Sequence, residues 1–178
     1  MAVRCNRCRA RPTPLTHNRA AGPYEGTLRT AIHALKYEGR RSLATPLAAL
    51  MRTRADAVIA GADAVVPVPL HRARHRSRGF NQSLDLARRL GPPVSPLLTR
   101  VRATHVQAEL SEEARAANVL GAFRAASDID AARGAVLVLV DDVSTTGATL
   151  EACAQVLLDA GAKEVRAVTA ARAVRLRS

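Results

Sequence analysis

The stretch VLVLVDDVSTTGATL, residues 136–150, decides the fold class of this chain. It opens with an uninterrupted apolar run, residues 136–140, which is typical of a strand buried on both faces of a parallel sheet. Apolar residues then recur at helical spacing from Leu150 onward, and Gly161 ends that pattern. Two carboxylates and a hydroxyl-rich turn lie between the strand and the helix. They are therefore predicted at the carboxyl end of a strand, where open α/β sheets bind ligands.

The residues between the strand and the helix combine an anion site with two carboxylates. The turn consists of Ser144, Thr145, Thr146, Gly147, Ala148 and Thr149. Backbone N–H groups at a helix N-terminus bind anions, hydroxyls add donors, and a glycine permits a positive φ, so the turn suits a phosphate monoester. Asp141 and Asp142 would repel phosphate, but they suit ribose hydroxyls or a hydrated Mg²⁺. Together these groups describe a site for a 5-phosphoribosyl group. A surface Asp pair before a capped helix would not explain the joint order of carboxylates and hydroxyls.

Composition narrows the class of protein. A chain of 178 residues with 48% hydrophobic residues predicts one globular domain with a real core. The formal charge of +12 comes almost entirely from arginine and favours polyanions, either phosphate-bearing substrates or nucleic acid. Aromatic residues make up only 2%, which argues against base-stacking platforms. The chain has neither a G-x-x-x-x-G-K-[ST] nor a G-x-G-x-x-G motif, so a P-loop or a dinucleotide fold is disfavoured.

The cysteines and the apolar segments bear on metal binding and location. Cys5-x-x-Cys8 is half of a four-ligand zinc site, and no second C-x-x-C follows it. It is read as a partial zinc site, a metal-free remnant, a site shared between subunits, or the result of a start codon placed too late. Cys153 lies on the apolar face of the predicted helix and is interpreted as core. No segment resembles a signal peptide or a membrane span, so a cytoplasmic protein without membrane insertion is expected.

A second strand, AVVPV at residues 64–68, leads into the most basic segment of the chain, residues 69–82, predicted as a loop. Loops at the same end of a sheet can face one ligand, and an Arg-rich loop opposite a phosphate turn suits a pyrophosphate. The candidates for this role are Arg74, Arg76, Arg78 and Gly79. A solvated basic loop or a nucleic-acid contact is the competing interpretation. Further strands are expected at residues 94–101, 120–123 and 165–169.

The polar segment at residues 102–118 suggests a lid that closes over substrate. Its candidate residues are Thr104, Gln107, Arg115 and Asn118. A closed lid would keep water from a reactive sugar intermediate.

The DD…TTGAT segment resembles the phosphoribosyl pyrophosphate (PRPP) loop of type I phosphoribosyltransferases. By this resemblance Asp141 and Asp142 hold the ribose hydroxyls, and residues 144–149 hold the 5-phosphate. Three further blocks are similar to the ComF family: YEGTLRTAIHALKYEGRRSLATPLA from Tyr24, PVPLHRARHRSRGFNQSLDLA from Pro67, and RVRATHVQAELSEEARAANVLGAF from Arg100. The family commonly carries an N-terminal four-cysteine zinc module, of which Cys5 and Cys8 match half. It is linked to natural competence, and the resemblance implies contacts with single-stranded DNA and competence proteins.

The expected fold is α/β and type I phosphoribosyltransferase-like, with a mostly parallel central sheet flanked by helices. The expected division is an N-terminal Cys-x-x-Cys segment at residues 1–23 and a phosphoribosyltransferase-like domain at residues 24–178. The sequence is compatible with three functions: a Mg²⁺-dependent phosphoribosyltransferase of unknown acceptor, a protein that senses PRPP, and a competence factor that binds single-stranded DNA. Zn²⁺ binding and an oligomeric state are left open.

Overall fold

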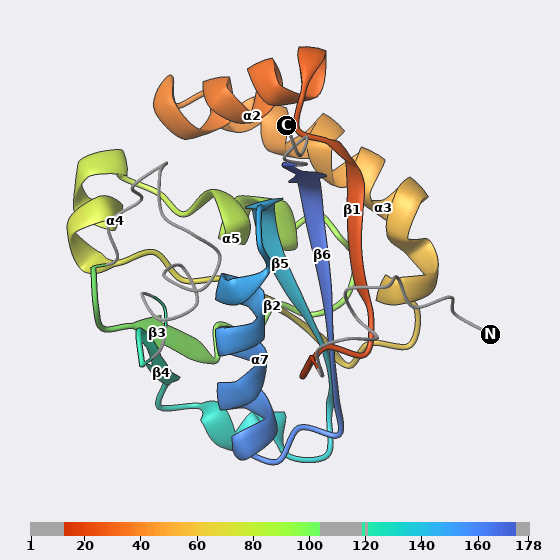
Figure 1. Ribbon diagram of the computed structural model, residues 1–178, viewed down its shortest axis with the longest axis vertical. Coiled ribbons are helices and arrows are strands. Elements are labelled where there is room, and N and C mark those ends of the chain that lie inside the picture. Colours follow the sequence, from red (N-terminus) through yellow and green to blue (C-terminus); the bar gives the residue numbers. More distant parts are fainter. Residues whose placement is uncertain (1–12, 104–118, 120, 174–178) are drawn as a thin grey trace, which may run out of the picture.

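A computed structural model describes residues 13–103, 119 and 121–173 (Figure 1). Its centre is a four-stranded sheet in the order β1-β6-β5-β2, in which every neighbouring pair is parallel. The strands are β1 (Asn18–Pro23), β2 (Ala64–Pro67), β5 (Val136–Ser144) and β6 (Glu164–Arg172). A separate antiparallel pair is formed by β3 (Leu98–Arg100) and β4 (Phe123–Ala125). The expected α/β fold with a parallel central sheet is confirmed.

Helices cover both faces of the sheet. The helices are α2 (Gly26–Tyr37), α3 (Ala44–Ile59), α4 (Arg72–Arg78), α5 (Gln82–Ala87) and α7 (Ala148–Asp159), with short 3₁₀ turns η1 (Arg41–Leu43) and η2 (Ile129–Ala132), and α4 buries no residue. The sheet separates α3 and α5 on one side from α7 and the β3–β4 pair on the other (Figure 1). None of the helices in the described ranges is long and apolar enough to cross a membrane.

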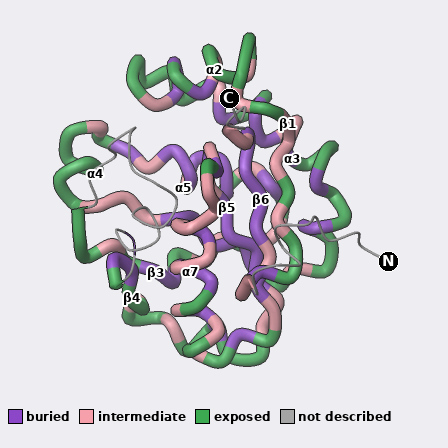
Figure 2. Tube along the Cα trace, in the orientation of Figure 1, coloured by how far each residue is buried: buried purple, intermediate pink, exposed green. Residues whose placement is uncertain are grey.

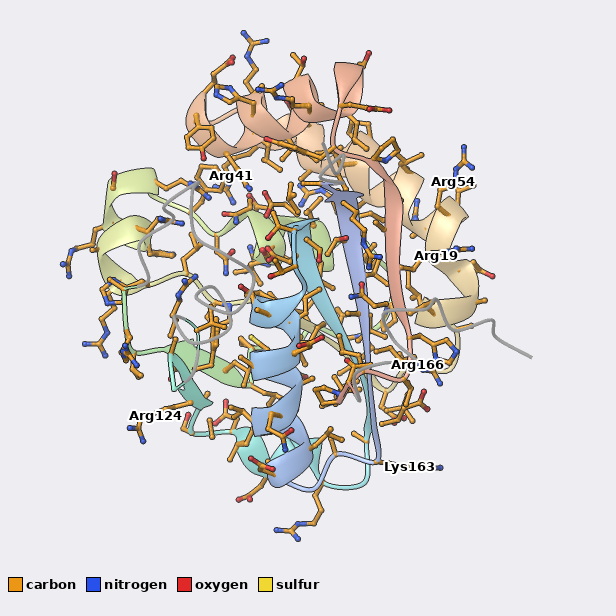
Figure 3. All side chains as sticks on the ribbon, in the orientation of Figure 1. Arg19, Arg41, Arg54, Arg124, Lys163 and Arg166 are labelled. Carbon is orange, nitrogen blue, oxygen red and sulfur yellow. The ribbon has the colours of Figure 1, made fainter. Side chains whose placement is uncertain are left out.

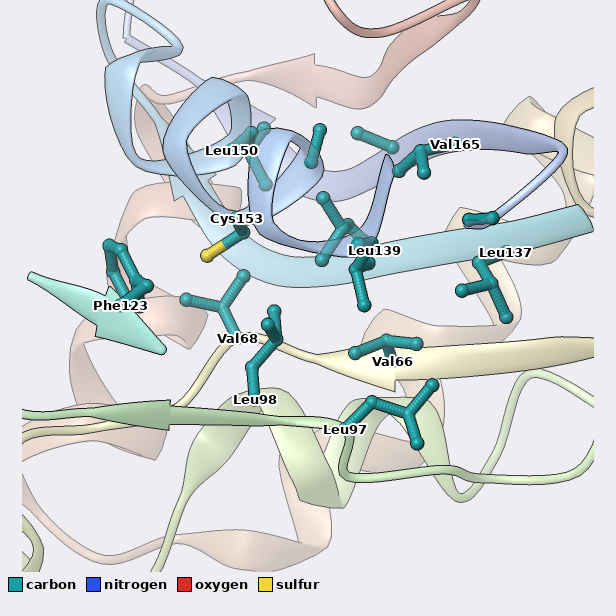
Figure 4. Packing of buried hydrophobic residues seen from close by; sticks show 14 of the residues in the cluster. Val66, Val68, Leu97, Leu98, Phe123, Leu137, Leu139, Leu150, Cys153 and Val165 are labelled. Carbon is teal, nitrogen blue, oxygen red and sulfur yellow. The ribbon is translucent and has the colours of Figure 1, made fainter. Parts of the chain in front are cut away.

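The apolar run that opens β5 supplies both halves of the core, because alternate side chains of a strand point to opposite faces. Leu137 and Leu139 pack with the α7 side, whereas Val138 and Val140 pack with α2, α3 and α5. Figure 4 shows Leu139 beneath α7, with Val68, Leu98 and Phe123 in the same cluster. The centre of the sheet is therefore buried on both faces, as Figure 2 shows for β5 and β6.

Several local predictions need correction. The basic segment is not a loop throughout, because residues 72–78 form α4. His71 caps this helix by accepting a bond from the Ala73 amide at 3.3 Å, and Gly79 ends it with φ +79°. Alanine and arginine are good helix formers, so the segment needs no apolar face to be helical. The strand expected at residues 94–101 is regular only over Leu98–Arg100, and the one expected at 120–123 lies at Phe123–Ala125.

Two of the predicted boundaries also move. β5 continues past Val140 to Ser144, because its pairing with β6 runs on to Arg172. Residues 18–23, expected in the N-terminal segment, form the edge strand β1 and pair with Ala167–Arg172 of β6. The boundary predicted after residue 23 therefore has to move toward the N-terminus, since β1 belongs to the sheet.

Candidate functional site

The hydroxyl-rich turn after β5 surrounds a small depression of about 40 Å³. Residues 143–150 line it together with Asp141. Gly147 is the N-cap residue of α7, with φ +88°, a conformation that favours glycine, and it has no side chain to cap the helix. The only bond to the Ala148 amide that involves a side chain of the described residues is a long one, 3.4 Å from Thr146 Oγ1. The N-terminus of α7 therefore offers backbone N–H groups to an anion in this depression.

Two further features fit a polar ligand at this turn. Ser144 Oγ is buried and has no hydrogen-bond partner within the described ranges. Buried hydroxyls normally have a partner, so this one suits a ligand that supplies it. The expected phosphate turn thus has the depression, the helix N-terminus and a hydroxyl that a ligand can engage.

Asp141 is oriented by groups from two elements. Its Oδ1 accepts hydrogen bonds from Ser83 Oγ at 2.8 Å and from the Asp142 amide at 2.9 Å. Loss of hydration around the carboxyl raises the pKa of Asp141, while Lys36 and the Ser83 hydroxyl act in the opposite direction. Lys36, Arg100 and Arg78 partly offset this cost, and the carboxyl oxygens of Asp141 can accept hydrogen bonds from a diol.

Asp142 is buried, with 4% of its side chain exposed, and its Oδ2 forms an ion pair with Lys36 Nζ. Lys36 lies in the last turn of α2 and is 18% exposed. The pKa of Lys36 is lowered to about 8. Burial is the largest cause, Asp141 opposes the lowering, and Arg78 and Arg74 add to it. The side-chain ammonium group of Lys36, from α2, therefore lies beside the carboxylate of Asp142.

Lys36 also lines a larger pocket of about 420 Å³ between the end of α2 and α4. The other lining residues are Tyr37, Gly39, Arg74, Ser77, Arg78 and Phe80. Arg78 lies over the Tyr37 ring, with its guanidinium carbon 5.5 Å from the ring centroid. Three cationic side chains thus converge on one pocket, and such an arrangement suits an anion with more than one negative charge.

Hydrogen bonds of the segment RGFNQ, residues 78–82, fix the position of Arg78 in this pocket. Arg78 donates a hydrogen bond to the Gln82 side chain, and Asn81 Nδ2 donates to the Val68 carbonyl at 3.1 Å. Asn81 Oδ1 also caps α5 by accepting from the Ser83 amide at 3.0 Å. These bonds join α4 to α5 and tie both to the end of β2, so they position Arg78 relative to that strand.

Arg41 contacts the same region of the structure through Phe80 and Asp85. It lies in the region between α2 and α4 (Figure 3) and makes two bonds of 2.7 Å to the buried carboxylate of Asp85. Its guanidinium carbon is 5.3 Å from the centroid of the Phe80 ring, which lines the larger pocket. Other arginines, such as Arg19, Arg54 and Arg124, are exposed and lie away from this pocket.

The structure brings together part of the predicted site. Asp141, Asp142 and the turn at residues 144–149 lie at one end of the sheet, and Arg74 and Arg78 line the neighbouring pocket. Arg76 is exposed and does not line that pocket, and neither does Gly79. The predicted lid residues Thr104, Gln107, Arg115 and Asn118 lie outside the described residues, as do Cys5 and Cys8. Within the described ranges, no cluster of three or more His, Cys, Asp or Glu residues could hold a metal ion.

Lys36, Tyr37 and Ser83 are among the residues of the site that were not predicted from the sequence. Lys36 and Tyr37 are the last two residues of a helix whose inner face is apolar. Their place in the helical pattern is therefore that of surface residues. One signal was available, because Lys36 is one of only two lysines in a chain whose other basic residues are arginine. Ser83 gives no such signal, because a serine near a helix start usually indicates capping.

The chain is similar to several known proteins. Residues 76–176 match the family model described as phosphoribosyl transferase domain. The chain is 38% identical over 172 residues to the DNA utilization protein YhgH of Salmonella typhi, covering 91% of this chain and 74% of that protein. It is 34% identical over 116 residues to competence protein F of Haemophilus influenzae, covering 62% of this chain and 51% of that protein. A solved structure of the allosteric regulatory enzyme of purine biosynthesis superposes with a TM-score of 0.49 and 20% identity, over 78% of this chain and 30% of that one.

Proposed function

The chain belongs to the ComF family, within the phosphoribosyl transferase domain superfamily, and from this premise we propose that it binds PRPP and transfers the phosphoribosyl group to an acceptor. One observation carries the proposal. A phosphate-sized depression at the start of α7 and a cation-lined pocket beside α4 flank the same Asp141–Asp142 pair. This order of anion site, carboxylates and anion site matches the order of groups in PRPP, namely phosphate, ribose diol and pyrophosphate.

In the proposed complex the 5-phosphate lies at the N-terminus of α7, where Ser144 Oγ and the turn threonines donate to it. Asp141 and Asp142 accept hydrogen bonds from the ribose hydroxyls. The pyrophosphate faces Arg74 and Arg78 in the larger pocket. Arginine suits this role because its planar fork can donate two bonds to a phosphate.

A magnesium ion that binds together with the substrate fits this arrangement. The two carboxylates do not form a complete cage, and Mg²⁺ commonly binds through one or two carboxylates together with substrate phosphates and water. Asp141 and Asp142 would hold the ion on the protein side. The ion would neutralise charge on the pyrophosphate.

The reaction in this proposal breaks the bond between ribose C1 and a pyrophosphate oxygen, and pyrophosphate leaves with the bonding electrons. A nucleophilic atom of the acceptor donates an electron pair to C1, and its proton passes to the released pyrophosphate or to water. Arg74 and Arg78 stabilise the negative charge that develops on the leaving group, which is a differential interaction that lowers the barrier. The carboxylates hold the sugar in place while its C1 becomes electron-deficient.

A first test separates the two anion sites by calorimetric titration with ribose 5-phosphate and with pyrophosphate. Arg78→Gln should weaken pyrophosphate binding roughly tenfold, the typical effect of removing a bond to a charged group, and leave ribose 5-phosphate unaffected. Arg76→Gln is the matched control on the same helix, because Arg76 does not line the pocket. Equal losses in both variants would contradict the assignment of the pocket.

Binding of single-stranded DNA is the second candidate function, and one observation favours it. Arg72, Arg74 and Arg76 are all exposed on α4, in a chain of net charge +12. The relative from Salmonella typhi carries the name DNA utilization protein. Exposed arginines would contact phosphates without reading sequence.

Fluorescence anisotropy with a labelled oligonucleotide tests this second function. We expect affinity that falls steeply with added salt and that is weakened by an Arg72→Gln/Arg76→Gln double variant. Asp142→Asn should not weaken DNA binding, because it removes a negative charge. Salt-independent binding would contradict an arginine-based interface.

A further inference from the structure

Lys36 belongs to both halves of the site. Its ammonium pairs with Asp142, the carboxylate at the ribose position, and its side chain also lines the pocket that contains Arg74 and Arg78. Asp142 Oδ2 has no other hydrogen-bond partner within the described ranges. The carboxylate that should receive a ribose hydroxyl is therefore held by the Lys36 ammonium.

The chemistry of the lysine side chain allows this cation to change partners. The ammonium is a point charge on a flexible four-carbon stem, with rotatable donors that can turn to another acceptor. A pyrophosphate in the pocket beside α4 would present several charged oxygens near Nζ. Arg78 can bind the pyrophosphate without releasing Asp142, because its side chain is bonded to Gln82. Arg41 is likewise held elsewhere, by two bonds to Asp85.

We propose that Lys36 moves from Asp142 to the pyrophosphate when the larger pocket is filled, and so frees Asp142 to accept a ribose hydroxyl. Filling of the pyrophosphate pocket then strengthens binding of the ribose in the neighbouring site. By linkage, the ribose strengthens pyrophosphate binding by the same factor. The proposal rests on the proposed function, because it assigns the ribose and the pyrophosphate to the two sides of the carboxylate pair.

The test measures the affinity for ribose 5-phosphate with and without saturating pyrophosphate, by calorimetry. It is done in the presence of EDTA, so that no metal ion can bridge the two ligands. In the wild-type protein pyrophosphate should tighten ribose 5-phosphate binding at least fivefold, the lower end of typical coupling between sites. Without Lys36 the like charges of the two ligands would give no tightening or a weakening.

Lys36→Gln is the decisive variant, and Lys36→Arg restores the charge. In Lys36→Gln the coupling should disappear, whereas ribose 5-phosphate alone should bind at least as tightly as to wild type because Asp142 is no longer occupied. That retained affinity also demonstrates that the variant is folded. Lys36→Arg should recover part of the coupling.

The outcomes distinguish the two levels of the proposal. If ribose 5-phosphate binds wild type but pyrophosphate does not tighten it, or if Lys36→Gln keeps the full coupling, the role of Lys36 is wrong and the proposed function stands. If ribose 5-phosphate does not bind the wild-type protein, the proposed function and this inference both fail.

Discussion

Lys36 at the end of α2 and Asp142 near the end of β5 form an ion pair that joins the helical layer to the carboxylate motif of the central strand. The pair is largely shielded from water, with 18% and 4% of the two side chains exposed. Removing one partner of a shielded pair leaves a charge with little compensation, whereas removing both does not.

This pair leads to a prediction on stability. Lys36→Met should lower the free energy of unfolding by about 3 kcal/mol, because Asp142 is left buried without its cation. Adding Asp142→Asn to that variant should restore part of the loss, with a coupling of about 1–3 kcal/mol. Urea unfolding of the two single variants and the double variant measures the coupling. Strictly additive losses would mean that the pair contributes nothing.

Gly147 gives a prediction that separates backbone strain from ligand binding. A methyl group at Gly147 would meet only side-chain atoms at 3.9 and 4.0 Å, but φ is +88°. Gly147→Ala should therefore destabilise the protein by about 1 kcal/mol or more through its backbone alone. It should also weaken ribose 5-phosphate binding, because the phosphate turn has to shift.

The matched control for that variant lies at the other end of the same helix. Gly161 has φ +93°, and a methyl group there would contact Arg133 at 3.6 Å. Gly161→Ala should lower the thermal unfolding temperature to a similar extent and leave ribose 5-phosphate binding unchanged. A loss of binding in both variants would indicate that helix stability, and not the turn, controls affinity.

Cys153 is predicted to be unreactive in the folded protein. It is fully buried in the cluster beneath α7, and burial raises the pKa of its thiol well above the ordinary value. Because the thiolate is the reactive form, iodoacetamide should not modify Cys153 without denaturant and should modify it fully in urea. Peptide mass spectrometry gives the modified fraction. Rapid labelling under native conditions would contradict this packing.

Glu164 provides a pH-dependent contribution to stability. Hydrogen bonds from Arg166 and Thr16 lower the pKa of Glu164 to about 2 from 4.5. Because the folded-state pKa is depressed, the stabilisation is present above pH 4.5 and is lost as the pH falls toward 2. Glu164 is only partly buried, so Glu164→Gln should cost no more than about 1 kcal/mol at neutral pH.

Urea midpoints of the wild type and Glu164→Gln across that acidic range check this expectation. The difference between the two proteins should shrink steadily as the pH falls. A difference that does not change with pH would mean that the carboxylate charge is not the source of the stabilisation.

The central strand and its turn were predictable because their signals are local. An apolar run, adjacent carboxylates, threonines and Gly147 lie within one stretch, and the helix that follows has regular apolar spacing. Burial on both faces follows directly from such a run in a parallel sheet.

The features that the sequence did not predict depend on contacts between segments that are far apart in the chain, or lack a periodic pattern. β1 reads NRAAGP, which has no strand pattern, and it becomes a strand through its bonds to β6 at the sheet edge. α4 has no apolar face, so hydrophobic periodicity could not reveal it. The contact between Lys36 and Asp142 joins residues far apart in the chain and depends on how α2 packs over the strand ends. The role of Lys36 therefore required the three-dimensional arrangement.

The most direct test of the proposed function is a calorimetric titration of PRPP, with and without Mg²⁺, into the wild-type protein and an Asp141→Asn/Asp142→Asn double variant. We expect magnesium-dependent binding to the wild type and its loss in the double variant, with thermal unfolding as the control for folding. Absence of PRPP binding to the wild type, or equal binding to the double variant, would contradict the assignment of the carboxylates to the ribose. DNA binding through the exposed arginines would then be the leading function.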